Sequence, residues 1–244
     1  PGDVLVASYP KSGTTWVGKI VTKLLPSIKH ENTYVELRFS ADSQTASEDY
    51  EALPRPRMLK THLKYEFFSK KVQEGNIKVI IALRNPKDTL VSFYHMYQFA
   101  AFGSYSGSFA DFLQLFKSKK LVYGDIFEWM TSWWPVRDLP NVLVVKYEDL
   151  IADCEGGIRR LGDFLHVTIS DERIKEIAED CRFKAMKSEG VGSREVFFRK
   201  GVVGDWKNFF EEDQAEYIDE LTRLHLQPIG LELSDESINS INFT

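Results

Sequence analysis

Short apolar runs alternate with segments of helical spacing along this 244-residue chain. The apolar runs are continuous and rich in branched residues, which predicts buried strands of a parallel sheet. They lie at residues 4–7, 58–63, 77–83 and 141–147. Apolar residues spaced by three and four predict helices. The helical segments are 17–25, 87–100, 109–117, 121–134, 155–165 and 171–180. This alternation predicts a doubly wound α/β fold with a central parallel sheet flanked by helices.

Polar segments interrupt the alternation in three places. Residues 30–57 are irregular, and two prolines exclude a helix near their end. Residues 188–204 combine glycine with charge, which is typical of a functional loop. Residues 234–244 are expected to fray. No repeat or low-complexity linker divides the chain, so we predict a single domain over residues 1–244.

Charge and cysteine content narrow the class of protein. A formal net charge of -5 argues against general attraction to nucleic acid or anionic membranes, although it is compatible with a local basic pocket. Cys154 and Cys181 are too few for a secreted disulfide framework and favour a reducing cytoplasm. No apolar run approaches the length of a membrane span. No charged and apolar leader precedes the first strand, and we expect that a longer natural N-terminus has been trimmed.

The stretch SYPKSGTTW, residues 8–16, joins the first strand to the first helix. Lys11 and the hydroxyls of Ser12, Thr14 and Thr15 gather at a helix N-terminus, where the helix dipole favours anions. A P-loop of the nucleotide triphosphatases would instead have glycine at position 8 and lysine at position 14. A glycine turn that only starts a helix needs no such donors, whereas a diphosphate-like ligand does.

Two further basic segments predict a second anion site. Arg84 follows the strand at 77–83, at the sheet edge where the first loop also ends. Ser92 lies two turns along the following helix. Phe198-Arg199-Lys200-Gly201 has the composition of a flexible phosphate clip, although a solvated charged turn has it too. Together the segments imply a ligand with two separated anionic groups.

Lys60 and His62 offer a cation and a base. Residues two apart on a strand face the same side, so the pair could take a proton from a hydroxyl and stabilise the charge that forms. A lone histidine is also common as a structural or exposed residue. No paired-cysteine motif or close histidine pair is present, and we expect no metal site.

Three motifs in order, YPKSGTTW, KTH and RKGVVGDWKNFF, resemble the cytosolic sulfotransferase family. The likeness runs from about Asp3 to Leu233. It implies a P-loop-like nucleotide-binding sulfotransferase fold. It also implies transfer of a sulfuryl group from 3′-phosphoadenosine 5′-phosphosulfate to the hydroxyl, or the amine, of a small aromatic or hydrophobic acceptor. The product nucleotide would be adenosine 3′,5′-bisphosphate.

The resemblance also implies residue roles. His62 matches the catalytic base, Lys60 a cation beside the transferred group, and Lys11 the lysine at the bridging oxygen. The other matched positions bind the donor. They are Ser12, Gly13, Thr14 and Thr15 at phosphate; Trp16, Tyr147, Cys181 and Phe183 at adenine; and Arg84, Ser92, Phe198, Arg199, Lys200 and Gly201 around the 3′-phosphate.

Departures from the family pattern affect the adenine end and the assembly. Cys181 stands where a threonine is usual, and Arg182 where a serine is common. The acceptor segments 26–57 and 184–198 are shorter than in better-known animal enzymes. In the family's homodimer motif, Lys207 and Glu216 are kept. Glu211 and Glu212 replace its threonine and valine, which leaves the homodimer open.

Two other functions compete with this one. A small P-loop kinase is disfavoured by Thr14 at the lysine position and by the missing magnesium carboxylate. A nucleotide-binding module without catalysis would keep Lys11 and Arg84 but would not need His62. Sulfuryl transfer needs in-line positioning and relief of leaving-group charge. Because the sulfuryl group carries less charge than a terminal phosphate, lysines suffice without a metal.

Overall fold

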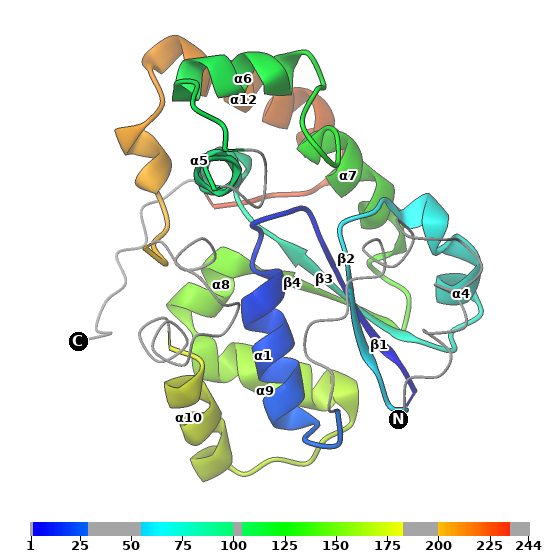
Figure 1. Ribbon diagram of the computed structural model, residues 1–244. Coiled ribbons are helices and arrows are strands. Elements are labelled where there is room, and N and C mark those ends of the chain that lie inside the picture. The colour runs from blue at the N-terminus through cyan, green and yellow to red at the C-terminus, as the bar shows by residue number, and fades with distance from the viewer. Residues whose placement is uncertain (1, 29–54, 100–103, 183–199, 235–244) are drawn as a thin grey trace.

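The computed structural model describes residues 2–28, 55–99, 104–182 and 200–234 (Figure 1). A four-stranded parallel sheet in the order β2-β1-β3-β4 lies at its centre. The strands are β1 (Val4–Ser8), β2 (Met58–Thr61), β3 (Lys78–Leu83) and β4 (Val142–Lys146). The predicted α/β class with a central parallel sheet is therefore confirmed.

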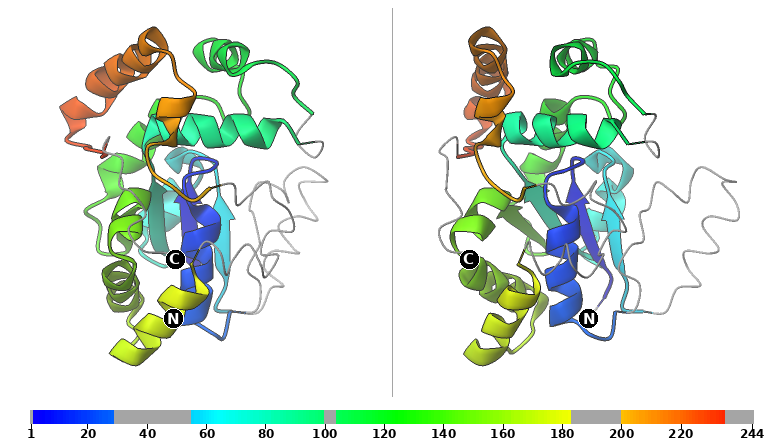
Figure 2. Two further views of the ribbon diagram at one scale, coloured as in Figure 1. Left: turned by 90° about the vertical axis from the view of Figure 1, so that its left-hand side faces the viewer. Right: turned by 60° about the vertical axis from the view of Figure 1, so that its left-hand side comes forward.

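Helices cover both faces of this sheet (Figure 2). One face packs against α1 (Thr14–Leu24), α8 (Tyr147–Ala152), α9 (Cys154–Leu165) and α10 (Asp171–Asp180). The other packs against α4 (Ser69–Gln73), α5 (Pro86–Tyr97), α6 (Phe109–Lys117), α7 (Ile126–Trp133) and α12 (Glu212–His225). Short 3₁₀ helices are η1 (Tyr65–Phe67), η3 (Trp134–Val136), η4 (Asp205–Asn208) and η5 (Gln227–Ile229).

The strands read as continuous apolar runs because both of their faces are buried. In β1, Val4 and Val6 belong to the core beneath α1, whereas Leu5 and Ala7 belong to the core beneath α5. This division follows from the two-residue period of side chains along a strand. Lys60 in β2 is charged and yet buried, at 2% exposure, whereas Lys78 and Lys146 at strand ends are half-buried.

Within the described residues, three α-helices lie where the sequence predicted none. They are α4, α8 and α12. Tyr147, expected at the end of a strand, begins α8 directly after β4. The helix expected over 121–134 begins at Ile126, because the Asp125 side chain accepts a hydrogen bond from Phe127 N and caps it.

Parallel pairing brings the carboxyl ends of all four strands to one edge of the sheet. The register sets Ala7 beside Thr61 and Leu83 beside Lys146. The loop after β1, His62 after β2 and Arg84 after β3 therefore start from the same edge, where open α/β sheets bind their ligands.

Candidate active site

The loop from Tyr9 to Gly13 is shaped by two left-handed residues. Lys11 has φ of 70° and Gly13 has φ of 101°. A side chain at Gly13 would also place its Cβ 3.1 Å from Cδ2 of Tyr147. Glycine is thus required both for the turn and for the close approach of Tyr147. The buried hydroxyls of Ser8 and Thr14 are hydrogen-bonded to one another across the loop.

Buried polar atoms near this loop lack partners within the described residues. They are Ser12 Oγ, Trp16 Nε1 and Arg84 Nε. Ser12 is 1% exposed. Buried polar atoms are nearly always hydrogen-bonded, and orphans of this kind call for an explanation. Ser12 and Trp16 lie at the N-terminus of α1, and Arg84 donates to the Lys11 carbonyl of the same loop, so the three atoms fit an anionic ligand that accepts hydrogen bonds.

Arg84 connects three segments that are distant in the sequence. Its Nη1 donates to the Lys11 carbonyl at 3.3 Å, and its Nη2 donates to the Val202 carbonyl at 3.2 Å. The guanidinium lies over the ring of Tyr147, 4.3 Å from the centroid. Tyr147 in turn meets Trp16 edge-on, with ring centroids 5.3 Å apart. The structure therefore brings these residues of the predicted donor site together.

The start of α5 organises the third basic segment. Asn85 caps α5 by accepting from Lys87 N and Asp88 N. Asp88 accepts hydrogen bonds from Gly204 N at 2.7 Å and Trp206 N at 3.0 Å. These bonds hold the residues after Lys200-Gly201 against α5. Ser92, one turn after Asp88, is half-buried on the same helix.

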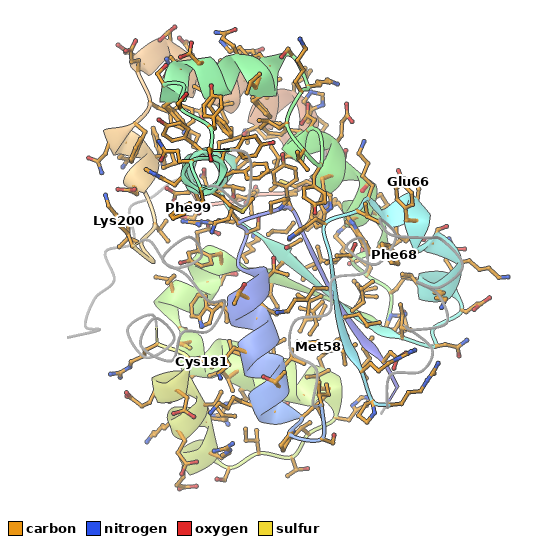
Figure 3. All side chains as sticks on the ribbon, in the orientation of Figure 1. Met58, Glu66, Phe68, Phe99, Cys181 and Lys200 are labelled. Atoms are coloured by element: carbon orange, nitrogen blue, oxygen red, sulfur yellow. The ribbon has the colours of Figure 1, made fainter. Side chains whose placement is uncertain are left out.

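Lys200, Gly201 and Cys181, which are also predicted to bind the sulfuryl donor, each have a different environment. Lys200 pairs with the buried Asp205 at 2.7 Å while about half of its own side chain stays exposed, and Gly201 has φ of 68°. Cys181 is buried in the core beside α1 at the end of α10, where burial raises the pKa of its thiol to about 12 (Figure 3). Phe183, Phe198 and Arg199 lie outside the described residues.

His62 is held in one tautomer. Its Nδ1 lies 2.8 Å from the Ser8 carbonyl oxygen. Because a carbonyl only accepts, Nδ1 carries the proton and Nε2 keeps a lone pair in the neutral ring. Burial, with a smaller effect from the charges of Lys60 and Lys11, lowers the pKa of His62 to about 4 against the opposing effect of the Ser8 bond. His62 is therefore neutral at pH 7, as a base must be.

The side chain of Lys60 packs against α1 at Gly18. A Cβ added to Gly18 would lie 2.8 Å from Lys60 Cε and 3.2 Å from Lys60 Nζ. A side chain at this position would therefore displace the end of Lys60. Since the charges of Lys60 and Lys11 both act on His62, the three predicted catalytic side chains form one electrostatic group.

The comparisons with known proteins decide the family. The sulfotransferase domain model matches residues 1–230. The chain belongs to the sulfotransferase family. Human sulfotransferase 1C2 is 30% identical over 249 residues, covering 93% of this chain and 84% of the relative. Mouse sulfotransferase 6B1 is 34% identical over 225 residues, covering 89% of this chain and 74% of the relative.

Solved structures agree with this assignment. Mouse sulfotransferase SULT7A1, complexed with PAP, superimposes with a TM-score of 0.83 at 30% identity, covering 93% of this chain and 84% of its own. Retinol dehydratase, in complex with androsterone and the inactive cofactor PAP, gives 0.82 at 25% identity, with coverage of 96% and 83%. The resemblance drawn from the three sequence motifs is thus confirmed at the level of family and fold.

Two features beside the candidate site did not emerge from sequence reasoning. Tyr123 meets the His62 ring edge-on at 5.1 Å. The next residue, Gly124, accepts a hydrogen bond from the buried Tyr9 hydroxyl at 2.7 Å. Glu148 is buried, its pKa is raised by burial, and it accepts from Asn85 N at 2.8 Å. Gly124 was the available signal for a turn in the sequence, and in the structure Tyr123 and Gly124 have φ of 72° and 71°.

Neither a metal-binding cluster nor a membrane-spanning helix occurs in the part of the chain that the structure describes. No group of three His, Cys, Asp or Glu side chains there could hold a metal ion. No helix within the same residues is long and apolar enough to cross a membrane. Metal-free catalysis stays a prediction.

Proposed function

We propose that this chain transfers a sulfuryl group from 3′-phosphoadenosine 5′-phosphosulfate to the hydroxyl of a small acceptor, with His62 as the base. One observation carries the proposal. The Ser8 carbonyl fixes the His62 imidazole, while the Ser8 hydroxyl is bonded to Thr14 in the loop whose orphaned donors fit an anion. Ser8 therefore contacts both the neutral base, His62, and the loop that would bind the anion. The PAP held by the SULT7A1 structure supports the nucleotide part.

The binding roles follow from the cluster around Arg84. The Ser12 hydroxyl and the N-terminus of α1 suit the 5′-phosphosulfate end, and Lys11 on the same loop suits the bridging oxygen. Arg84, with its free Nε–H, suits the 3′-phosphate. Trp16 and Tyr147 suit the adenine end, since aromatic faces stack on bases.

Each of these residues has a separate role in the proposed transfer reaction. The donor supplies the sulfuryl group and leaves as adenosine 3′,5′-bisphosphate. His62 Nε2 accepts the acceptor's hydroxyl proton as the oxygen bonds to sulfur and the bond from sulfur to the bridging oxygen breaks. Lys11 and Lys60 offset the negative charge around the transferred group. Removing one such charge-stabilising donor typically costs about 3 to 4 kcal/mol of transition-state stabilisation.

The acceptor is a finer proposal that rests on the sequence. The segments 26–57 and 184–198 are short, and most of their residues lie outside the described ones. We infer an open pocket that accepts aromatic or hydrophobic hydroxyls with loose shape selectivity. A cytoplasmic location and an optional homodimer likewise remain predictions from cysteine content and from the altered motif at 207–216.

Transfer from labelled donor to a panel of acceptors tests the function. The panel pairs a small phenol with a bulky steroid alcohol and an arylamine. The His62→Asn variant keeps an N–H where Nδ1 stands but has no base, so it should bind adenosine 3′,5′-bisphosphate normally and lose about 10²- to 10⁴-fold in turnover. Binding without transfer would favour a nucleotide-binding module. Preference for ATP with a magnesium requirement would favour a kinase.

A further inference from the structure

The carbonyl of Leu63, the residue after His62, accepts two indole hydrogen bonds. Trp129 Nε1 donates to it at 3.0 Å and Trp133 Nε1 at 3.1 Å. Both tryptophans are fully buried on α7, one turn apart. A carbonyl oxygen has two lone pairs, so two donors saturate it. We call this arrangement, made by Leu63, Trp129 and Trp133, the indole clamp.

The surroundings keep the indole clamp rigid. Trp133 stacks on Phe68 with ring centroids 6.0 Å apart and meets Tyr65 edge-on at 5.5 Å. Tyr65 N donates to Ser132 Oγ of α7 at 3.2 Å. On the other side, Leu63 N donates to Thr61 Oγ1 at 3.1 Å. The chain leaving β2 is therefore fastened to α7 within three residues of the end of the strand.

His62 lies between two anchors. The pairing of β1 with β2 runs to Ala7 and Thr61, and His62 is the next residue along the chain. The ring is held by the Ser8 carbonyl at Nδ1, and the peptide that follows is held by α7 through Leu63. A side chain keeps its direction only when its backbone is fixed as well as its polar end.

We propose that Trp129 and Trp133 are positioning residues for the reaction: by holding the Leu63 carbonyl, they aim Nε2 of His62 at the acceptor hydroxyl. This inference rests on the proposed role of His62 as base. A displacement of about 1 Å from a reactive geometry can cost about 100-fold in rate. Two buried N–H groups on one carbonyl thus have a functional use beyond filling the core.

Trp→Phe variants distinguish the positioning of His62 from the packing of the core, because phenylalanine keeps an aromatic ring but has no N–H. The Trp129→Phe/Trp133→Phe double variant should lower kcat about 10- to 100-fold, and each single variant should lower it less, since one indole remains. The dissociation constant for adenosine 3′,5′-bisphosphate should stay within about twofold of wild type, because neither indole bond of the clamp involves a residue proposed to bind the nucleotide.

Two control variants come from the same stretch of chain. Trp134→Phe removes an indole bond of the same kind, which runs to the Ile229 carbonyl at 2.8 Å. Met130→Ala removes buried volume from α7 between the two tryptophans without touching the clamp bonds. Neither should lower kcat more than about twofold once the protein is folded at the assay temperature. An equal loss in either control would overturn the proposal in favour of general core damage.

A readout independent of activity is the NMR titration of the His62 ring in histidine-labelled protein. In wild type and both controls the midpoint should lie near 4. In the double variant it should rise toward the ordinary value of about 6.5, since a loosened ring gains water. An unchanged midpoint together with unchanged kcat would refute the clamp. If wild type transferred no sulfuryl group, the proposed function would fail while this titration still tested the clamp. If the double variant did not fold, the two single variants would decide it.

Discussion

Acidification should destabilise this protein through His62 before most carboxylates respond. The pKa of His62 is about 4 in the folded chain, whereas an unfolded histidine titrates near 6.5. Between these two values the unfolded chain binds the extra proton and the folded chain does not. The free energy of unfolding therefore falls as pH drops through this window, and the contribution of the neutral ring is complete above pH 6.5.

The size of the effect follows from the two pKa values. The full difference corresponds to about 3 kcal/mol, at roughly 1.4 kcal/mol per pKa unit. Between pH 7.5 and pH 5 the loss from this one ring is about 2 kcal/mol. That is a large part of the roughly 5 to 15 kcal/mol by which domains are usually stable.

Urea unfolding at a series of pH values measures this change in the free energy of unfolding. The comparison is between wild type and His62→Asn, because asparagine keeps the bond to the Ser8 carbonyl and does not titrate. The variant should lose about 2 kcal/mol less than wild type between pH 7.5 and 5. His225→Gln, at an exposed histidine, serves as the control for removing a histidine elsewhere. Equal pH slopes for wild type and His62→Asn would mean that the ring is hydrated in the folded chain and that the reasoning is wrong.

Three further outcomes are expected. Arg84→Ala should weaken adenosine 3′,5′-bisphosphate by about 1.5 to 3 kcal/mol and adenosine 5′-phosphate much less, as measured by calorimetry; equal losses would remove Arg84 from the 3′ site. Gly18→Ala should lower kcat about tenfold or more at unchanged nucleotide affinity, because its Cβ would displace the end of Lys60; normal turnover would show that the reaction does not depend on the present position of the Lys60 ammonium. Activity should survive exhaustive chelation, and an absolute magnesium requirement would point to the kinase instead.

The sheet could be predicted because its strands are buried on both faces. Residues 79–83 form a run of branched and apolar side chains that no amphipathic helix would carry, and they lie in β3. The helix α12 escaped prediction because it is rich in acidic residues and buries only Ile218 completely. Its position depends on a tertiary contact with the rest of the core, which outweighs local pattern.

The site could be predicted only in part for a similar reason. That Lys60 and His62 face one side follows from the strand period. The tautomer of His62 depends on the Ser8 carbonyl, and no pattern along the chain indicates that contact. The same holds for Arg84, whose partners Lys11 and Val202 are separated from it by 73 and 118 residues. Motifs identify which side chains take part, whereas packing determines which atoms meet.

The parallel sheet has a consequence for how this protein is made. Its strands cannot pair through local hairpins, and the His62 to Ser8 bond joins residues 54 apart, the same separation as the pairs of β1 with β2. Such long-range closure slows folding. On the ribosome, β1 emerges first, while the Val202 carbonyl that meets Arg84 emerges roughly 10 to 40 s after Lys11 at about 5 to 20 residues per second. During that interval both edges of the apolar strand β1 are unpaired and exposed. The yield of active protein should therefore depend on chaperones and on the temperature during synthesis.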